Sequence, residues 1–418
     1  MSSGTSFYSV GEPVALRPFD KLRDSKLRVQ LVHLQKCQHP IIKFSNRLIF
    51  KFFKSMALNQ NRYPEPNAAS LPNSAFPIFA PHKSLILSPF ASVSELFEAF
   101  NRLKVLVIGD VMLDAYLWGK VDRISPEAPV PIVAVQKKES RLGGAANVAI
   151  NVRSLGATPI LCSVVGNDRN GEELLRLMRE LGMDTAGMVL SDDRVTTVKT
   201  RVIGNNHQLL RVDEEILQDL NARESQELRV KIESLLDSTR PDVVVFEDYD
   251  KGVLTPSLIA AVVEACKSRN IPTAVDPKKK NFEAYSGVSL FKPNLAELKS
   301  GLKTDIDKTD SEGLHRLTTP FRTAHGIQTL LVTLSESGVF YGNNEKHGII
   351  PAHIRNISDV SGAGDTVISV ASLCLALGLS TPTLAALSNL AGGLVCEKVG
   401  VVPVDKQQLL HEAAHLQL

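Results

Sequence analysis

Two glycines and an aspartate stand directly before an apolar run in the last part of this 418-residue chain. The motif is Gly362-Ala363-Gly364-Asp365, and the helix-like run spans Val367–Leu377. Glycines at a helix start let backbone N–H groups converge on one point, where the helix dipole adds positive potential. In the first turn, Asp365 would accept a proton from a nearby hydroxyl group. This combination suits phosphoryl transfer to an alcohol. For an isolated motif the alternative is a glycine-rich turn with a capping aspartate.

Short apolar runs alternate with helix-like segments over most of the chain. This alternation predicts an α/β fold with a mostly parallel sheet that is covered by helices on both faces. In such sheets, ligands bind at the carboxyl ends of the strands. The expected strands are Lys104–Gly109, Thr158–Val165, Asp242–Glu247, Pro272–Asp276, Ser289–Lys292 and Thr329–Thr333. The expected helices are Ala145–Leu155, Gly171–Leu181, Arg223–Asp237, Pro256–Arg269 and Thr383–Lys398, with Val93–Leu103 ahead of the first strand.

Polar residues gather where the expected strands end. Each group alone is a plausible solvated loop, but parallel strands bring all of these ends to one edge of the sheet. We therefore expect a binding site at that edge. The groups are Asp110 and Asp114, Gly143–Asn147, Glu247–Gly252, Asp276-Pro277-Lys278, Lys292–Glu297, Thr333–Gly338 and Gly362–Asp365.

Two β-prone, charged segments break the strand–helix alternation. They are Val130–Arg141 and Val195–Val212, and they predict a small antiparallel lid made of residues 130–141 and 195–212. Basic residues here are candidates for binding a phosphate group on the substrate. The alternative is that the charges only keep an exposed sheet soluble. These candidates are Lys199, Arg201 and Arg211, with Arg123 and Arg141 near the first segment.

Residues 1–92 differ from the rest of the chain. The first 100 residues carry 12 Lys/Arg and 6 Asp/Glu, and Asn59–Pro81 is rich in Asn, Pro and Ser. We interpret residues 1–92 as a disordered or non-native N-terminal extension. The alternatives are a targeting segment and an amphipathic membrane-surface or partner helix around Ile41–Leu58. The folded domain is expected over residues 93–418.

Composition excludes several classes of function. The net charge is only +2, and the balance after residue 100 is negative, which argues against nucleic-acid binding. The sequence has no apolar run of the ~18 residues that a membrane helix needs. Five cysteines without a C-x-x-C motif predict buried thiols in a cytoplasmic protein. His411-Glu-Ala-Ala-His415 matches a zinc motif, but no third ligand is evident.

Taken in this order, the motifs resemble those of the ribokinase-like (PfkB-type) carbohydrate kinases over about residues 95–405. Within that family, two segments look like those of the D-glycero-β-D-manno-heptose-7-phosphate kinases of ADP-heptose synthesis. They are Arg123–Pro131 and Gly143–Asn147. The motifs Asp248-Tyr249, Lys251-Gly252, Asp276-Pro277-Lys278 and Asn206-x-Gln208-x-x-Arg211 with Asp213 point the same way.

The resemblance implies a three-layer ribokinase-like fold and ATP-dependent phosphorylation of the heptose 7-phosphate at O1, in the synthesis of lipopolysaccharide core precursors. Asp365 would deprotonate the anomeric hydroxyl group. In the catalytic motif Gly362–Asp365, the backbone amides of Ala363, Gly364 and Asp365 would stabilise the transferring phosphoryl group. Sugar-binding residues would be Asp110, Asp114, Gly143, Gly144 and Asn147. ATP-binding residues would be Asn294, Leu295, Ala296, Glu297, Thr333, Ser335, Gly338 and Asn389, with Asn294 and Glu297 holding Mg²⁺ through water.

Two departures from the family pattern stand out. Glu247 occupies a position where relatives often have Ser, and Ser361 replaces the usual Thr. The sequence lacks the His-x-Gly-His motif of a fused nucleotidyltransferase, so we expect the kinase step only, with a separate nucleotidyltransferase. The expected partners are a small-molecule sugar phosphate and a second subunit through the lid. Alternatives are a fructose 6-phosphate or ribose kinase, and a catalytically silent sugar-binding module.

Overall fold

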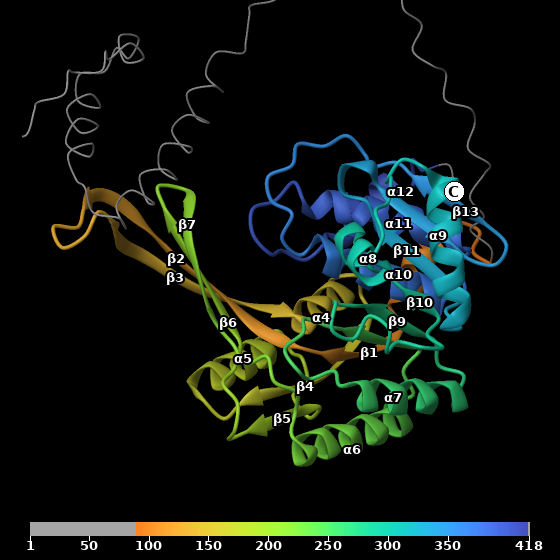
Figure 1. The fold of residues 1–418 in the computed structure, drawn as a ribbon, viewed down its shortest axis with the longest axis horizontal. Coiled ribbons are helices and arrows are strands. Elements are labelled where there is room, and N and C mark those ends of the chain that lie inside the picture. Colours follow the sequence, from red (N-terminus) through yellow and green to blue (C-terminus); the bar gives the residue numbers. More distant parts are fainter. Residues whose placement is uncertain (1–88, 417–418) are drawn as a thin grey trace, which may run out of the picture. The chain divides into compact units, whose positions relative to one another are not determined.

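The computed structural model describes residues 89–416, so most of the proposed extension over residues 1–92 lies outside the described residues. Within 89–416, nine strands form one sheet in the order β13-β12-β11-β10-β9-β8-β1-β4-β5 (Figure 1). Neighbouring strands from β5 to β11 run parallel, and β12 and β13 add an antiparallel edge. The strands are β1 (Lys104–Gly109), β4 (Thr158–Gly166), β5 (Met188–Ser191), β8 (Val243–Glu247), β9 (Thr273–Asp276), β10 (Leu290–Phe291), β11 (Thr329–Thr333), β12 (Val339–Gly342) and β13 (His347–Ile350).

Helices cover both faces of this sheet because alternate residues of the central strands enter two separate cores. Val105 and Val107 of β1 belong to one core, and Leu106 and Ile108 belong to the other. The first core is closed by α3 (Val93–Phe100), α4 (Ala145–Ser154), α5 (Arg169–Glu180), α10 (Ala363–Ala376), α11 (Thr381–Val395) and α12 (Lys406–Ala413). The second is closed by α6 (Ala222–Thr239), α7 (Pro256–Ser268), α8 (Leu295–Leu302) and α9 (Ser311–Ala324). The predicted α/β class is confirmed.

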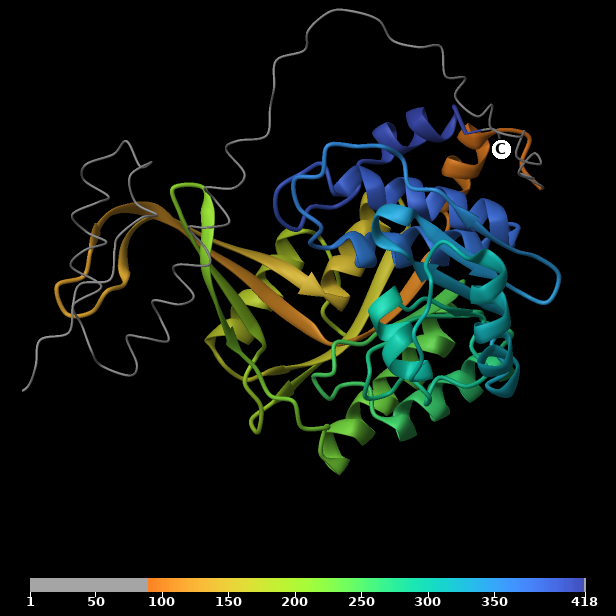
Figure 2. The ribbon, with the colours of Figure 1, turned by 45° about the horizontal axis from the view of Figure 1, so that its top comes forward.

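A second sheet of four strands among the described residues extends away from the first, as Figure 2 shows. Its order is β3-β2-β6-β7, built from β2 (Val111–Ile124), β3 (Pro131–Gly144), β6 (Val198–Gly204) and β7 (His207–Glu214). The two predicted lid segments lie on β3 and on β6 with β7. The expected purely antiparallel arrangement is wrong, because β2 pairs in parallel with β6. We missed β2 because its mixed polar and apolar residues follow Gly109-Asp110, which we interpreted as a strand end.

Several element boundaries differ from the prediction. Helix α10 begins at Ala363 and not at Val367, so the glycine motif is part of the helix start itself. Helices α8 and α9 and the edge strands β12 and β13 were not anticipated. Across the described part of the chain, no helix combines the length and apolarity needed to cross a membrane. Cys162, Cys266, Cys374 and Cys396 are buried free thiols, and Cys37 lies outside the described residues.

Candidate active site

The start of α10 forms an anion cradle. Gly362 adopts a left-handed conformation (φ +80°), which turns the chain into the helix without a side-chain cap. The Ala363 N–H makes a long bond of 3.3 Å to the Val360 carbonyl. The N–H groups of Gly364 and Asp365 have no acceptor among residues 89–416. Two free donors at a positive helix end are suited to bind phosphate oxygens.

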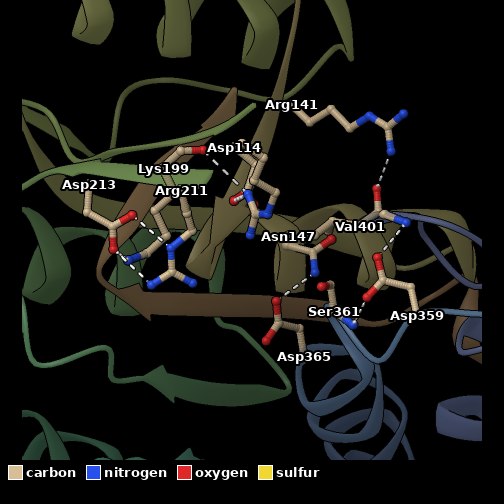
Figure 3. Close-up of polar contacts among 12 residues, drawn as sticks. Asp114, Arg141, Asn147, Lys199, Arg211, Asp213, Asp359, Ser361, Asp365 and Val401 are labelled. Atoms are coloured by element: carbon tan, nitrogen blue, oxygen red, sulfur yellow. Dashed lines mark hydrogen bonds and ion pairs between the residues drawn. The ribbon is translucent and has the colours of Figure 1, made fainter. Parts of the chain in front are cut away.

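The carboxylate of Asp365 is held beside these donors by two hydrogen bonds. Asn147 Nδ2 donates to Oδ2 at 2.6 Å, as Figure 3 shows, and the Tyr249 hydroxyl donates to Oδ1 at 2.8 Å. The three residues come from α10, α4 and the loop after β8. Burial raises the pKa of Asp365 to about 6, although both hydrogen bonds favour its ionised form. Asp365 is therefore ionised at neutral pH and is a stronger base than an ordinary carboxylate.

Asn151 fixes which way Asn147 points. Its Nδ2 donates to the Asn147 carbonyl at 3.0 Å and lies 3.4 Å from Asn147 Oδ1, so the Asn147 amide nitrogen is directed toward Asp365. Its own Oδ1 accepts from Thr366 Oγ1 and from the Val404 N–H. Asn151 is fully buried one turn after Asn147 on α4. Asn151 thus links α10, which carries Asp365, to α4, which carries Asn147.

A polar loop joins the cradle to the lid. Asp359 accepts from the Ser361 N–H and from the Gly400 N–H, both at 2.9 Å. Arg141 of β3 donates to the neighbouring Val401 carbonyl at 3.0 Å (Figure 3). The chain segment that leads into the glycine motif is therefore tied to the base of the second sheet.

Three side chains lie in a row under the cradle because they occupy matching positions on adjacent parallel strands. Glu247 at the end of β8 is the register partner of Asp276 at the end of β9, and Lys292 follows β10. Asp276 forms ion pairs with Lys292 at 2.7 Å and Lys278 at 3.2 Å. Burial favours its neutral form, but the two ammonium groups lower the pKa of Asp276. A Cβ on Gly364 would lie 3.5 Å from Asp276 Oδ2, so this row directly underlies the cradle.

The predicted magnesium residues form a capping box at the start of α8. Asn294 Oδ1 accepts from the Glu297 N–H at 2.9 Å, and Glu297 Oε2 accepts from the Asn294 N–H at 2.8 Å. Glu297 Oε1 also pairs with Lys278 at 2.7 Å. All these side-chain oxygens therefore have partners within the protein. Leu295 and Ala296 form the first turn between them.

The other predicted ATP-binding residues lie along the β11–β13 side of the sheet. Thr333 ends β11 and forms a β-bridge with Asn294. Ser335 begins a short 3₁₀ turn. Gly338 has a φ of +94°, and a Cβ there would lie 2.0 Å from the Ile350 carbonyl oxygen. Asn389 of α11 donates to the Pro351 carbonyl at 2.8 Å. The structure thus places Thr333 beside Asn294, and it places Asn389 beside the segment after β13.

On the sugar side, Asp110 anchors the loop that carries Tyr249. It accepts from the N–H groups of Tyr249, Lys251 and Val253 at 2.8, 3.1 and 3.0 Å. Burial, followed by the nearby Asp248, raises the pKa of Asp110 to about 6. Much of its hydrogen-bonding capacity is therefore committed to the protein.

Two predicted glycines make room for aspartates. A Cβ at Gly143 would lie 2.3 Å from Asp114 Oδ2, and one at Gly144 would lie 2.3 Å from the Asp110 carbonyl oxygen. Gly144 also needs a positive φ of +61° where β3 enters α4. Asp114 is itself buried on β2 and forms an ion pair with Arg201 of β6.

The basic lid residues lie in two adjacent rows on one face of the second sheet. Strand register aligns Arg141, Asp114, Lys199 and Asp213 in one row and Glu139, Tyr116, Arg201 and Arg211 in the next. Each cation has an acidic partner: Arg211 with Asp213 (Figure 3), Arg141 with Glu139, Arg201 with Asp114, and Lys199 with Asp213 and Glu215. Arg123 is exposed near the far end of β2, roughly 30 Å along the strand from Asp114.

Sequence reasoning missed four residues of this site: Tyr249, Asn151, Lys278 and Lys292. Tyr249, Lys278 and Lys292 belonged to motifs or strand-end groups that we quoted without a role. Lys292 could have been placed from strand alternation, since it follows Leu290 by two residues. No sequence signal identified Asn151. In the zinc-like motif near residue 411, Glu412 forms an ion pair with Arg355.

A glycine-rich helix start with a carboxylate base, at the carboxyl ends of a parallel sheet, defines the class of ribokinase-like sugar kinases. The model of the pfkB family of carbohydrate kinases matches residues 102–407, and the chain belongs to this family. The predicted family is confirmed. Carbohydrate kinases of this family use ATP as the phosphoryl donor.

The chain is similar to proteins named bifunctional protein HldE. The one from Trichlorobacter lovleyi is 41% identical over 320 residues, covering 76% of this chain and 64% of the relative. The one from Desulfatibacillum aliphaticivorans is 40% identical, covering 74% and 63%. The chain therefore spans less than two thirds of the length of these relatives.

Solved structures support the fold. Phosphofructokinase-2 from Escherichia coli, in complex with potassium, aligns with a TM-score of 0.62 at 18% identity, covering 75% of this chain and 99% of that one. A putative ribokinase from Agrobacterium tumefaciens aligns with a TM-score of 0.59 at 19% identity, covering 75% and 97%.

The raised pKa of Asp365 predicts a pH-dependent gain in stability for Asp365→Asn. A carboxyl group whose pKa is higher in the folded state destabilises the fold when ionised, and this cost shrinks as pH falls from about 6 toward 3.8. The free energy of unfolding of Asp365→Asn minus that of wild type, both treated with EDTA, should be about 1 kcal/mol larger at pH 7 than at pH 5. Urea unfolding of both proteins at both pH values measures this difference.

The control for this experiment is Asp305→Asn, which changes an exposed carboxylate paired with Lys299. The ion pair holds the pKa of Asp305 below its usual value, so this variant should gain no stability at pH 7. A stability difference between Asp365→Asn and wild type that does not change with pH would contradict our account of the base.

The hydrogen bond from Tyr249 predicts a catalytic effect. Tyr249→Phe removes one donor to the ionised base and little volume, so kcat should fall by about ten- to a hundredfold. The KM for ATP should stay within twofold, since the one hydrogen bond that this hydroxyl group donates within residues 89–416 goes to Asp365. Tyr341→Phe, at the antiparallel edge, is the matched control. A wild-type kcat for Tyr249→Phe would show that this bond does not support the base.

Proposed function

We propose that this protein phosphorylates D-glycero-β-D-manno-heptose 7-phosphate at O1, with ATP as donor, to give the 1,7-bisphosphate. The observation that carries the phosphoryl-transfer reaction is the placement of Asp365, whose ionised carboxylate lies beside two free helix N–H groups. The heptose assignment is supported by the motifs at Arg123–Pro131 and Gly143–Asn147 and by 40–41% identity to proteins named HldE.

In the proposed reaction, Asp365 accepts the proton of the anomeric hydroxyl group as the bond from O1 to the γ-phosphorus forms. The bond from that phosphorus to its bridging oxygen breaks, and ADP leaves. Negative charge on the phosphoryl oxygens is met by the N–H groups of Gly364 and Asp365 and by the nearby Lys292 ammonium group. Asn147 and Tyr249 keep the base ionised until the acceptor arrives.

We propose that Mg²⁺ accompanies ATP and is held through water by Asn294 and Glu297. When bound, the ion would neutralise charge on the phosphate oxygens. The oxygen-rich capping box fits that hard cation, and Lys278 links it to Asp276 under the cradle. We assign the ATP side to Leu295, Ala296, Thr333, Ser335, Gly338 and Asn389, and the sugar side to Asp110, Asp114, Gly143, Gly144 and Asn147.

The phosphate group of the sugar would bind at the base of the lid. The guanidinium groups of Arg141 and Arg201 both lie over the Tyr116 ring, at 5.0 and 5.4 Å from its centroid. Because Arg201 is paired with Asp114, an arriving phosphate would compete with this carboxylate for the guanidinium group. Lys199 and Arg211 lie farther along the same face and complete the proposed clamp.

The lid also supports a proposed homodimer. It exposes a set of large apolar side chains that no described residue covers, at positions Ile124, Val130, Val135, Leu209, Leu210 and Val212. We place the reaction in the cytoplasm, where ATP is made available to biosynthesis. The proposal covers the kinase reaction only. The separate nucleotidyltransferase expected from the sequence is not supported, because the relatives are named bifunctional proteins and this chain spans less than two thirds of their length.

The substrate assignment predicts the outcome of a sugar panel. ADP release should be fastest with D-glycero-β-D-manno-heptose 7-phosphate, and its kcat/KM should exceed those for fructose 6-phosphate and ribose by at least a hundredfold. Asp365→Asn should lower kcat by several orders of magnitude while ATP binding is retained. A preference for fructose 6-phosphate or ribose would overturn the heptose assignment. If wild type binds the sugar but turns it over no faster than Asp365→Asn does, the protein is a catalytically silent sugar-binding module.

The phosphate clamp predicts that Arg201→Gln raises the KM for the sugar phosphate by at least tenfold, because a charge-assisted bond is lost. The KM for ATP should stay within twofold. The double variant Arg201→Gln/Asp114→Asn separates this effect from that of leaving Asp114 unpaired. Arg229→Gln, in an exposed pair on α6, is the control. If the single and the double variant both keep the wild-type KM for the sugar phosphate, the phosphate group of the sugar binds elsewhere.

A further inference from the structure

Asn151 is a buried polar residue that has no part in the reaction described above. It lies on α4, one turn after Asn147, and is 0% exposed. Its amide oxygen accepts from the Val404 N–H at 3.0 Å and from Thr366 Oγ1 at 3.1 Å. Its amide nitrogen donates to the Asn147 carbonyl at 3.0 Å and lies 3.4 Å from Asn147 Oδ1. These contacts are made to α4, to α10 and to the segment that precedes α12.

The direction of these hydrogen bonds is set by one backbone group. An amide side chain can turn over, which exchanges its donor and its acceptor. The Val404 N–H can only donate, so it must face Asn151 Oδ1, and Nδ2 must then face Asn147. Asn147 accordingly keeps its Oδ1 toward Asn151 Nδ2 and its own Nδ2 toward Asp365 Oδ2. The orientation of both amides therefore follows from a single N–H group.

Reversing the Asn147 amide would remove support from the base. Its Oδ1 would then face the Asp365 carboxylate, so two acceptors would replace a donor and an acceptor. Burial raises the pKa of Asp365, and the hydrogen bond from Asn147 is the largest of the effects that lower it. The other ionisable groups that act on this carboxylate are Tyr249, Glu247, Asp276 and Lys292. A change at Asn151 would leave all four in place.

The segment that supplies the orienting N–H group is itself held by the lid and by the turn into α10. The Val401 carbonyl accepts from Arg141 of β3 at 3.0 Å (Figure 3), and the Gly400 N–H donates to Asp359 at 2.9 Å. A Cβ on Gly362 would lie 3.3 Å from Val401 Cγ1, so the segment packs directly against the helix start. The orienting N–H group is therefore fixed relative to both the cradle and the base of the lid.

We propose that Asn151 is a positioning residue for the base: held in one orientation by the Val404 N–H, it directs the Asn147 amide nitrogen toward Asp365. It acts through Asn147 and needs no contact with sugar or ATP. Its effect is to keep a donor facing the carboxylate, so that the base is ionised when the acceptor hydroxyl group arrives. The inference rests on the proposed role of Asp365 and does not depend on which sugar is the acceptor.

The pH dependence of kcat/KM for Asn151→Leu tests the proposal, with the sugar phosphate preferred in the panel as substrate. This variant has a similar volume but releases the Asn147 amide, so the ionised base loses a donor and its pKa rises. The acidic limb of the profile should move up by about one pH unit, and kcat at pH 7 should fall at least tenfold. The KM for ATP should stay within twofold. Thr318→Val, which removes a buried hydroxyl group from α9, is the control and should keep the wild-type profile.

Asn151→Asp is the second variant, and it keeps the size of the side chain. Its neutral carboxyl group accepts from the Val404 N–H and offers an O–H donor to Asn147, and this donor is lost when the group ionises. Burial next to Asp365 raises the pKa of the introduced carboxyl group toward neutral pH or above. The ratio of its kcat to that of wild type should therefore fall at least tenfold between pH 6 and pH 9. Circular dichroism at each pH checks that the variant is folded.

A double variant tests whether Asn151 acts through Asn147. In Asn147→Leu the base has already lost this donor, so adding Asn151→Leu should lower kcat by less than twofold. A further tenfold loss would overturn the proposal, as would a wild-type acidic limb in folded Asn151→Leu or a kcat ratio for Asn151→Asp that does not change with pH. If Asp365→Asn keeps the wild-type kcat, the proposed function itself fails. If Asp365→Asn is inactive while the Asn151 variants behave like wild type, only this inference fails.

Discussion

The site depends on a single buried carboxylate that is kept ionised. Asp365 is only 5% exposed, and water cannot stabilise its charge as it would on the surface. The hydrogen bonds from Asn147 and Tyr249, together with the positive end of α10, replace that water. These interactions offset only part of the hydration that the carboxylate loses on burial, so the pKa of Asp365 is raised to about 6. Incomplete compensation is useful, since it leaves the carboxylate ionised and more basic than one in water.

The rest of the fold can be understood as the means of holding this group and its surroundings. The parallel sheet places Glu247, Asp276 and Lys292 side by side, because they occupy equivalent positions on neighbouring strands. The cradle above them comes from a helix that begins at Ala363, one residue after the left-handed Gly362. Arg141 ties the lid to the Val401 carbonyl, and the adjacent Gly400 N–H donates to Asp359 in the loop that precedes this helix start. Asp365, the N–H groups at the start of α10 and the base of the lid therefore lie close together, although their residues lie far apart in sequence.

The sequence predicted the parts of the site that depend on local chemistry or simple periodicity. Glycine next to an aspartate at a helix start, and polar groups at strand ends, were enough to place Asp365, Asn147 and Asp110 at one edge. It could not predict partners that depend on tertiary packing. The commitment of Asn294 and Glu297 to a capping box, and of Arg201 to Asp114, follows from side-chain geometry. Strand β2 was missed because its alternation begins at residues that we interpreted as a turn. Asn151 acts through Asn147 and Thr366, and such a relay leaves no pattern in a single sequence.

The most direct test of the central claim is a crystal structure of the enzyme with ADP, aluminium fluoride and the sugar phosphate preferred in the panel. We expect the acceptor oxygen to lie within hydrogen-bond distance, about 2.6–3.2 Å, of an Asp365 carboxylate oxygen. We also expect the fluoride ligands to accept hydrogen bonds from the N–H groups of Gly364 and Asp365. A complex in which the acceptor oxygen meets another side chain, or in which the aluminium fluoride lies away from the start of α10, would contradict this claim.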